Sequence, residues 1–204
     1  MFQTVEVKIK DLKSPNFLQI ENCENVYLPF QIIKRVETLN LINNTNIAFK
    51  KYNIKMVRKS VVVKVRTRSI NANTFQPKEL STLYVKNSSL NVFHEDLFDS
   101  QIIETIRLEN STVNRFNYNA FKNSTITTLS IKDCKIKDEI SKEAFTNVKI
   151  KELEIKGSIL EKVSSEAFDI AVEKKFEMSG NTFNKIESKA FQKMTFQVSC
   201  FSQT

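Results

Sequence analysis

The stretch Ile126-Thr-Thr-Leu129-Ser-Ile131-Lys-Asp-Cys134-Lys-Ile136 decides the fold, because similar stretches recur along the chain about every 23 residues. Its apolar residues Leu129 and Ile131 alternate with polar ones, which predicts a β-strand with one buried face. A repeat of this length predicts a solenoid, in which each unit buries its apolar face against its neighbours. Equivalent strand pairs occur at Leu83-x-Val85, Ile106-x-Leu108, Leu153-x-Ile155 and Phe176-x-Met178, and a further apolar residue follows each pair at Leu90, Val113, Ile136, Leu160 and Phe183.

Each unit closes with a phenylalanine, usually preceded by alanine, that follows an apolar residue by five positions. The spacing between successive phenylalanines is 23 or 24 residues. We therefore expect these aromatic residues to stack in a column behind the sheet. The motif occurs at Ile70…Phe75, Val92…Phe98 (one residue longer), Phe116…Phe121, Ile140…Phe145, Val163…Phe168 and Ile186…Phe191.

Two residues beyond each strand pair lies a column of Asn, Asp and Gly that includes both glycines of the chain: Asn22, Asn43, Asn87, Asn110, Asp133, Gly157 and Gly180. These residue types accept a positive φ at the lowest cost, so we predict a left-handed turn in every coil. The following column holds small hydrogen-bonding residues, which predicts a buried ladder that satisfies backbone groups of neighbouring coils. Its members are Cys23, Asn44, Ser88, Ser111, Cys134, Ser158 and Asn181.

The N-terminal third follows the same plan less regularly. Leu18-x-Ile20 and Leu39-x-Leu41 predict strands, Phe30 and Phe49 are interpreted as closing aromatics, and Val61, Val63 and Val65 mark a third strand. Val5-x-Val7-x-Ile9 and Phe196-x-Val198-x-Cys200 are predicted as strands at the two ends. We interpret 1–204 as one domain of about eight repeats, with a capping segment at 1–16, repeats at 17–191 and a C-terminal strand or cap at 192–204.

The pattern L-x-x-L-x-L-x-x-[N/C/S]-x-L resembles a leucine-rich repeat, most closely from Leu80 to Phe191, and the I-x-x-x-A-F box resembles the repeats of extracellular animal members. The resemblance implies an α/β horseshoe with a parallel sheet on the concave face and short irregular or helical return segments on the convex face. It also implies a non-enzymatic, secreted or extracellular protein that binds a protein ligand. Met1 to Lys10 lacks the apolar run of a signal peptide, and no stretch is apolar enough to span a membrane.

The usual binding surface of the family is the concave sheet face, so outward-facing strand residues are the candidate contact set. Their mixed charge and their many hydroxyl groups favour a polar protein ligand over a lipid or a nucleic acid. The residues are Thr82, Tyr84, Lys86, Thr105, Arg107, Glu109, Thr128, Ser130, Lys132, Glu152, Glu154, Lys156, Lys175 and Glu177.

The formal net charge of +8 is concentrated between Glu37 and Glu79, where the chain has cations and no carboxylate. An alternative function is therefore binding of a sulfated glycan or another polyanion at segment 50–68. Tyr52 is the only aromatic residue there, which disfavours nucleic acid. The structural alternative is a solvated loop followed by one strand with alternating cations. The candidate residues are Lys50, Lys51, Lys55, Arg58, Lys59, Lys64, Arg66 and Arg68.

A less favoured alternative is a parallel β-helix enzyme that degrades polysaccharide. The nearest approach to its carboxylate cluster is Glu152, Glu154 and Glu177, which ion pairs with neighbouring lysines explain more simply. His94 is the only histidine, and we interpret it as a surface residue rather than a catalytic one. No cofactor, metal site or catalytic residue is predicted.

The three cysteines do not form a disulfide framework. Cys23 and Cys134 are expected to be buried free thiols because they lie coils apart, whereas Cys200 is either free or paired with another chain. Four sequons predict N-glycosylation at Asn43, Asn87, Asn110 and Asn123. Three of these asparagines also belong to the turn column, where Asn has a structural reason to occur.

Overall fold

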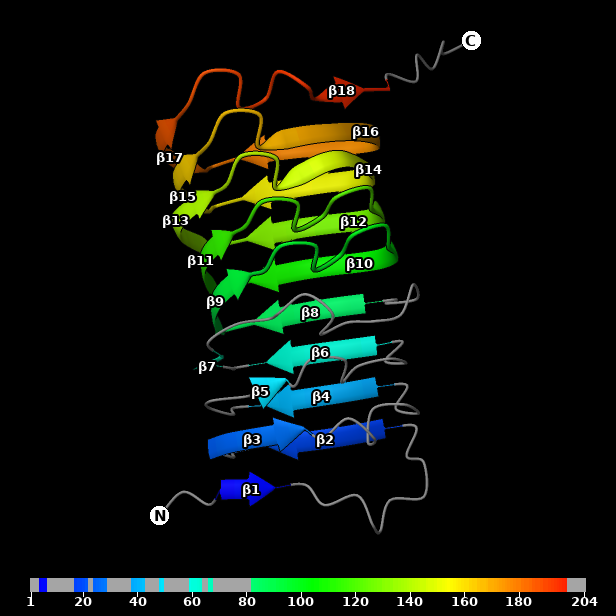
Figure 1. Cartoon of the computed structure of the whole chain (residues 1–204), viewed down its shortest axis with the longest axis vertical. Coiled ribbons are helices and arrows are strands. Elements are labelled where there is room, and N and C mark those ends of the chain that lie inside the picture. Colours follow the sequence, from blue (N-terminus) through cyan, green and yellow to red (C-terminus); the bar gives the residue numbers. More distant parts are fainter. Residues whose placement is uncertain are drawn as a thin grey trace.

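A computed structural model describes residues 82–197 and, upstream of them, the strand segments 4–6, 17–21, 24–28, 38–42, 48–49, 59–63 and 66–67. Figure 1 shows these strands stacked coil upon coil in one column. Residues 82–197 form about five coils, each built from two strands and a return segment. The predicted parallel-sheet solenoid is thereby confirmed. The described residues contain no helix, so the predicted helical return segments are not confirmed.

The larger sheet has nine parallel strands, in the order β18-β16-β14-β12-β10-β8-β6-β4-β2. Along β8 the burial alternates as the sequence predicts, with Leu83 and Val85 fully buried. The register places Leu83, Ile106 and Leu129 side by side, which builds one continuous apolar row. The strands are β2 (Phe17–Glu21), β4 (Thr38–Ile42), β6 (Lys59–Val63), β8 (Thr82–Lys86), β10 (Ile102–Glu109), β12 (Thr125–Lys132), β14 (Phe145–Lys156), β16 (Phe168–Ser179) and β18 (Thr195–Phe196).

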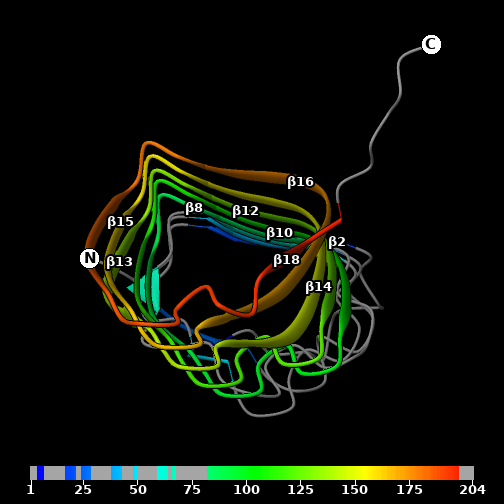
Figure 2. The ribbon, with the colours of Figure 1, turned by 90° about the horizontal axis from the view of Figure 1, so that it is seen from above.

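A second sheet of six parallel strands, in the order β17-β15-β13-β11-β9-β7, was not predicted. Viewed down the stack in Figure 2, it meets the larger sheet at a corner. It contains the recurrent apolar residues such as Leu90 and Val113, which the sequence analysis assigned to a return segment. Their strands lack strict alternation, because β11 buries Val113 and Phe116, three positions apart. The strands are β7 (Arg66–Thr67), β9 (Ser89–Phe93), β11 (Thr112–Phe116), β13 (Lys135–Ile140), β15 (Ile159–Val163) and β17 (Thr182–Ile186).

The third side of each coil carries the return segments. Turns occupy 95–100 and 118–123, whereas β14 and β16 begin already at Phe145 and Phe168 and extend to 12 residues each. The one coil that is a residue longer has its extra residue in β13, because Val113 aligns with Ile136 whereas Phe116 aligns with Ile140. The return side is therefore made of turns in the first two of these coils, largely of strand in the next two, and of turns again at 188–193.

The predicted phenylalanine column is confirmed. Ring centroids lie 5.0 Å apart for Phe98 and Phe121, 4.5 Å for Phe121 and Phe145, and 5.1 Å for Phe145 and Phe168. The register also corrects one prediction, because Phe93 and not Val92 aligns with Phe116. The interval from Phe93 to Phe98 is five residues, as in the other coils, so the apparent insertion disappears. Phe75 lies outside the described residues.

The turn column is confirmed for its five described members, whereas Asn22 and Asn43 lie outside the described residues. Their φ values run from 44° at Asn110 to 64° at Gly180. The backbone N–H groups of Asn87, Asn110, Asp133 and Gly157 reach the next coil, and that of Asn110 donates to the Lys132 carbonyl at 3.0 Å. The left-handed residue therefore turns the chain between the two sheets and also joins neighbouring coils.

The predicted hydrogen-bonding ladder is also confirmed among the described residues. The N–H of Ser88 donates to Ser111 Oγ (3.1 Å), that of Cys134 to Ser158 Oγ (3.1 Å), and that of Ser158 to Asn181 Oδ1 (2.9 Å). Side chains thus satisfy amides that the two sheets leave without a partner at the corner. Cys23 and Asn44 lie outside the described residues.

A second column of positive φ, next to the phenylalanines, was missed by the sequence analysis. Its φ values lie between 54° and 65°, and the N–H of Asn119 donates to the Glu143 carbonyl at 3.0 Å. The sequence does not reveal this column, because it contains Glu and Lys, which seldom adopt a positive φ. Its members are Asp96, Asn119, Glu143, Glu166 and Lys189.

At the N-terminal end, the predicted strands at 17–21 and 38–42 are confirmed. The third predicted strand is also present, as β6, but its register differs from the predicted one. Val62, and not Val61 or Val63, aligns with Leu41 and Val85 in the register of the larger sheet. The strand β1 (Thr4–Glu6) pairs with β3 (Glu24–Leu28), which pairs with β5 (Ala48–Phe49) in a separate sheet.

The remaining end predictions are tested only in part. Phe49 aligns with Leu28 inside the three-stranded sheet, and Phe196 lies in β18. Val7, Ile9, Phe30, Val65, Val198 and Cys200 lie outside the described residues.

Candidate interaction surface

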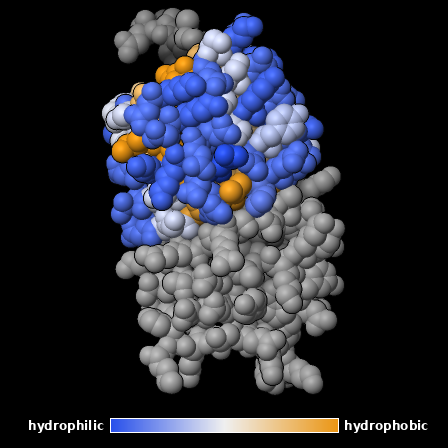
Figure 3. All heavy atoms as spheres, turned by 60° about the vertical axis from the view of Figure 1, so that its left-hand side comes forward, coloured by the Kyte–Doolittle hydropathy of each residue, from blue (hydrophilic) through white to orange (hydrophobic). Residues whose placement is uncertain are grey.

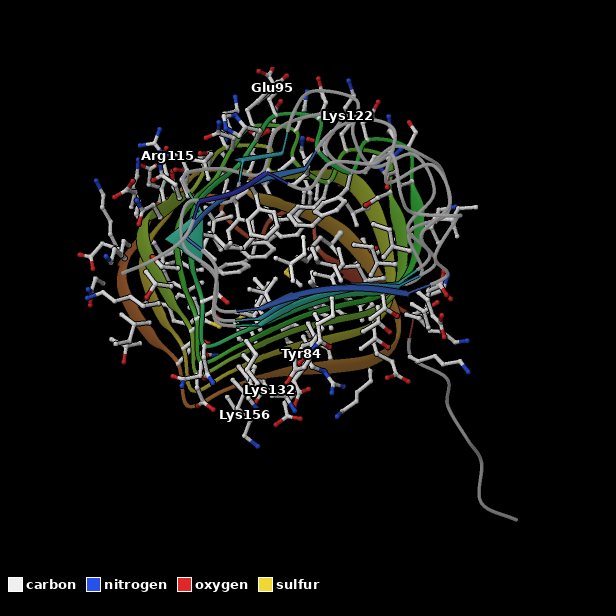
Figure 4. The ribbon with its side chains drawn as sticks, turned by 90° about the horizontal axis from the view of Figure 1, so that it is seen from below. Tyr84, Glu95, Arg115, Lys122, Lys132 and Lys156 are labelled. Atoms are coloured by element: carbon white, nitrogen blue, oxygen red, sulfur yellow. The ribbon has the colours of Figure 1, made fainter. Side chains whose placement is uncertain are left out.

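The outward side chains of β8, β10, β12, β14 and β16 form one surface, which we call the outer sheet face. It consists of the fourteen residues predicted to contact a partner. The register aligns them in rows, for example Tyr84, Arg107, Ser130, Glu154 and Glu177. Seen from below in Figure 4, Tyr84, Lys132 and Lys156 project from this sheet away from the core. The structure thus brings the predicted residues together on one side of the molecule.

One predicted contact residue is buried. Ser130 is only 1% exposed, and its Oγ donates to Glu154 Oε2 of the neighbouring strand at 3.3 Å. The alternation of β12 points Ser130 outward, but longer neighbouring side chains cover it. Ser130 therefore positions Glu154 and does not offer a surface of its own.

Tyr84, Lys86 and Glu109 form a cluster at one end of the face. The Tyr84 hydroxyl donates to Glu109 Oε2 at 2.6 Å, and Lys86 Nζ lies 2.6 Å from Glu109 Oε1. Hydrogen bonds from Lys86 and Tyr84 lower the pKa of Glu109, and the same contact raises the pKa of Lys86. Desolvation, followed by the hydrogen bond to Glu109, raises the pKa of Tyr84. The three side chains therefore satisfy one another and hold the Tyr84 ring in place.

Two of the three carboxylates considered for glycoside chemistry, Glu154 and Glu177, pair with lysines, whereas Glu152 has no ion pair among the described residues. Lys132 Nζ lies 2.9 Å from Glu154 Oε1, and Glu177 pairs with Lys156 (3.5 Å) and with Lys175 (3.4 Å). A hydrogen bond from Ser179, followed by that from Lys175, lowers the pKa of Glu177. A glycosidase acid needs the opposite shift. The predicted ion pairing is confirmed for Glu154 and Glu177.

Two charges on the outer sheet face remain without an ion pair among the described residues. Arg107 is exposed between Tyr84 and Ser130, and Glu152 is exposed on β14. Arg107 also lies beside the two threonines Thr105 and Thr128. Because its neighbours are already engaged with one another, Arg107 is the cation of this face that is most available to a ligand.

A shallow hollow of about 410 Å³ lies at the corner, lined by Lys132, Asp133, Lys156, Gly157, Ser179 and Gly180. Gly157 lines it, and a Cβ at this position would meet the Asp133 carboxylate. The sequence analysis did not predict this hollow. The change from Asn and Asp to Gly within the turn column was the available signal.

The polyanion candidates fall largely outside the described residues. Lys59 begins β6 of the larger sheet, and Arg66 lies in β7 of the six-stranded sheet. Residues 82–197 contain 17 cations and 17 carboxylates, so the excess charge lies elsewhere in the chain. The candidates outside the described residues are Lys50, Lys51, Lys55, Arg58, Lys64 and Arg68.

Three predicted glycosylation sites are exposed, namely Asn87, Asn110 and Asn123. Asn110 Nδ2 donates to Asn87 Oδ1 at 2.7 Å, and Asn147 Nδ2 donates to Asn123 Oδ1 at 3.0 Å. These amides thus also bridge neighbouring coils. Asn43 lies outside the described residues.

Cys134 and His94 are the other side chains whose pKa is shifted by burial. Cys134 is a buried free thiol, and burial raises its pKa to about 11. Burial lowers the pKa of His94. The described residues contain no cluster of His, Cys, Asp and Glu that could hold a metal ion. They also contain no helix with the length and hydrophobicity needed to cross a bilayer.

The sequence matches the family model of the BspA type leucine rich repeat region in six copies, over residues 34–138 and 117–203. The chain belongs to this family. The BspA type is a bacterial type, so the predicted membership among extracellular animal proteins is not confirmed. No curated protein and no solved structure matches the chain. Leucine-rich repeats are in general protein-interaction modules rather than enzymes.

Proposed function

We propose that this BspA-type repeat protein binds a protein ligand through the outer sheet face, centred on Tyr84 and Arg107. The proposal rests on which charged side chains of this face form ion pairs and which do not. Most ionised side chains of the face pair with one another, whereas Arg107 stands exposed beside a tyrosine ring held by Glu109. Tyr and Arg are enriched among the residues that dominate binding energy.

The regular geometry of the face supports the same proposal. Parallel strands at about 4.8 Å spacing present side chains in fixed rows, and pairs such as Lys132–Glu154 limit their rotation. A ligand therefore meets a preorganised surface and loses less side-chain entropy on binding. The threonine row Thr82, Thr105 and Thr128 adds hydroxyl groups that can pair with a polar surface.

The test compares proteins captured from an extract of the native organism by the wild type and by Arg107→Glu. Lys137→Glu is the matched control, because Lys137 is exposed on β13 of the other sheet. We expect one set of captured proteins to be lost with Arg107→Glu and kept with Lys137→Glu. An identical set from all three proteins would refute the proposal.

A second candidate function is polyanion binding by segment 50–68, favoured by the balanced charge of residues 82–197. Heparin is the probe, titrated at 50 mM and 200 mM salt. Polyanion binding weakens steeply with salt because counterions are released. The variant Lys50→Glu/Lys51→Glu/Lys55→Glu should abolish heparin binding and leave capture through Arg107 unchanged.

Secretion and N-glycosylation remain part of the proposal, supported by the exposure of Asn87, Asn110 and Asn123. The measurement is the mass of the native protein before and after treatment with an N-glycosidase. An unchanged mass would remove the glycans from the proposal.

A further inference from the structure

The outer sheet face carries two exposed charges of opposite sign. Arg107 on β10 and Glu152 on β14 are both exposed, and neither forms an ion pair among the described residues. The opposite charges beside them are already engaged. Glu109, on the same strand as Arg107, pairs with Lys86 at 2.6 Å. Lys175, which the register aligns with Glu152, pairs within its own strand at 3.4 Å. Arg107 and Glu152 are therefore the two charges of this face that a partner can neutralise.

The strand register fixes the separation of these two charges. Arg107 aligns with Ser130, and Ser130 aligns with Glu154, so Glu152 lies two strands and two residues away from Arg107. With strands about 4.8 Å apart and a rise of about 3.3 Å per residue, the two Cα atoms are separated by about 12 Å. The midpoint falls on β12, between Thr128 and Ser130. Ser130 is buried and Thr128 is short and half-buried, so no long side chain projects between the two charges.

A two-fold axis above this midpoint brings each charge of one copy opposite its complement in another. The axis lies between two facing sheets and runs perpendicular to the line that joins Arg107 and Glu152. Rotation about it places Arg107 of each copy over Glu152 of the second copy. The ion pair forms twice, because an isologous interface repeats every contact. The other charges of the face pair within their own copy and need no partner from the second one.

The six-stranded sheet offers no such complementarity. Figure 3 turns this side of the molecule toward the viewer, and its described part is a largely hydrophilic surface with scattered apolar residues. Lys135 and Lys137 of β13 are exposed and have no ion pair in the part of the chain that the structure describes. Glu161 instead accepts a hydrogen bond from Asn184 Nδ2 at 2.8 Å. Two unpaired cations repel the same cations of another copy, so this sheet does not favour self-association.

We propose that the protein ligand of the outer sheet face is a second copy of this chain, an inference that rests on the proposed function of that face. The two copies dock face to face about the two-fold axis above β12, with Arg107 of each copy paired to Glu152 of the other. Thr105 and Thr128 lie beside the axis and supply hydroxyl groups that can pair across the contact. Complementary charges of this kind fix the register of an interface, and the isologous contact closes at two copies.

The first experiment measures the mass of the full chain by sedimentation velocity across the micromolar range. We expect a concentration-dependent dimer that Arg107→Glu and Glu152→Arg each weaken at least tenfold, because each substitution places like charges opposite one another twice. Lys137→Glu is the matched control for the change in net charge and should leave the dimer intact. A wild type that stays monomeric throughout the range overturns the inference, as does a dimer that withstands both substitutions.

The second experiment mixes the two weakened variants and tests the pairing itself. In a mixed dimer, Glu at position 107 of one copy meets Arg at position 152 of the other, and Arg107 meets Glu152 at the symmetric site. We expect Arg107→Glu and Glu152→Arg to associate with each other at least tenfold more tightly than either does with itself. Lys137→Glu should not substitute for Arg107→Glu in the mixture. A mixture no tighter than the separate variants would rule out the Arg107–Glu152 contact.

The two experiments separate this inference from the proposed function. A monomeric wild type, together with proteins whose capture depends on Arg107, would overturn the dimer and leave the proposed function standing. Thermal unfolding of each variant establishes that it is folded, which both exposed positions permit.

Discussion

The coil of β14 and β15 and the coil of β16 and β17 use the same columns but experience different surroundings. Leu153 and Leu160 are at most 1% exposed because a coil covers them on each side. Phe176 and Phe183 occupy the same positions one coil later, where Phe176 is 41% exposed and Phe183 is only partly buried. The comparison teaches that burial in this protein is a property of neighbouring coils and not of a residue's own apolarity.

The largest expected effect is at the phenylalanine column. Phe145→Ala should lower the free energy of unfolding by about 3–5 kcal/mol, because the ring is fully buried between two others. Phe191→Ala should cost clearly less, since Phe191 is only partly buried at the end of the column. Urea unfolding of both variants measures the difference. Equal losses would mean that the last coil is covered as fully as the middle ones.

The second-largest loss of stability is expected in the hydrogen-bonding ladder at the corner between the two sheets. Ser158→Ala removes the acceptor of the buried Cys134 N–H and should cost about 1–3 kcal/mol. Ser89→Ala, at an exposed position of β9, should change stability by less than about 0.5 kcal/mol. Thermal or urea unfolding compares the two. A similar small change in both would show that water satisfies the amide instead.

Substitution of the two glycines compares a middle coil, which contains Gly157, with the last described coil, which contains Gly180. Gly157→Ala should cost about 1–2 kcal/mol for its φ of 59°, and more because the new Cβ meets the Asp133 carboxylate. Gly180→Ala adds only ordinary contacts of 3.7 Å or longer to the same backbone cost. Asp133→Gly in the Gly157→Ala background removes the carboxylate without adding strain at the φ of 50° of position 133, and it should recover the difference. No recovery would place the cost entirely in the backbone.

The smallest effect is a pH dependence at Glu139 on the six-stranded sheet. Burial opposes its ionisation, but hydrogen bonds from Lys162, Ser141 and Ser164 outweigh burial and lower its pKa below 4.5. The carboxylate therefore stabilises the fold above pH 4.5, and this contribution is lost as the pH falls through the lower folded-state pKa.

The measurement is the free energy of unfolding between pH 3 and pH 7. Glu139→Gln should flatten part of its acid slope, whereas Glu95→Gln, at an exposed position, should leave the slope unchanged. Identical slopes in Glu139→Gln and the wild type would contradict the assignment.

The sequence predicted much of the candidate surface, but not its internal pairing. Alternation along β8 to β16 placed the fourteen residues on one face because strand periodicity is local. Which of them remain available depends on residues about 23 positions away. Ser130 is buried under Glu154 and Arg107 stays exposed for that reason, and no local pattern distinguishes the two.

By itself, the sequence determined the repeat length, the strands of the larger sheet, the phenylalanine column and the turn at residues such as Asn110 and Gly157. Each of these depends on short-range periodicity or on the conformational preference of one residue type. Only the tertiary structure decided the six-stranded sheet, the second left-handed column and the exposure of Phe176. Those features arise from the alignment of one coil on the next, and that alignment sets both the register and which side chains a neighbour covers.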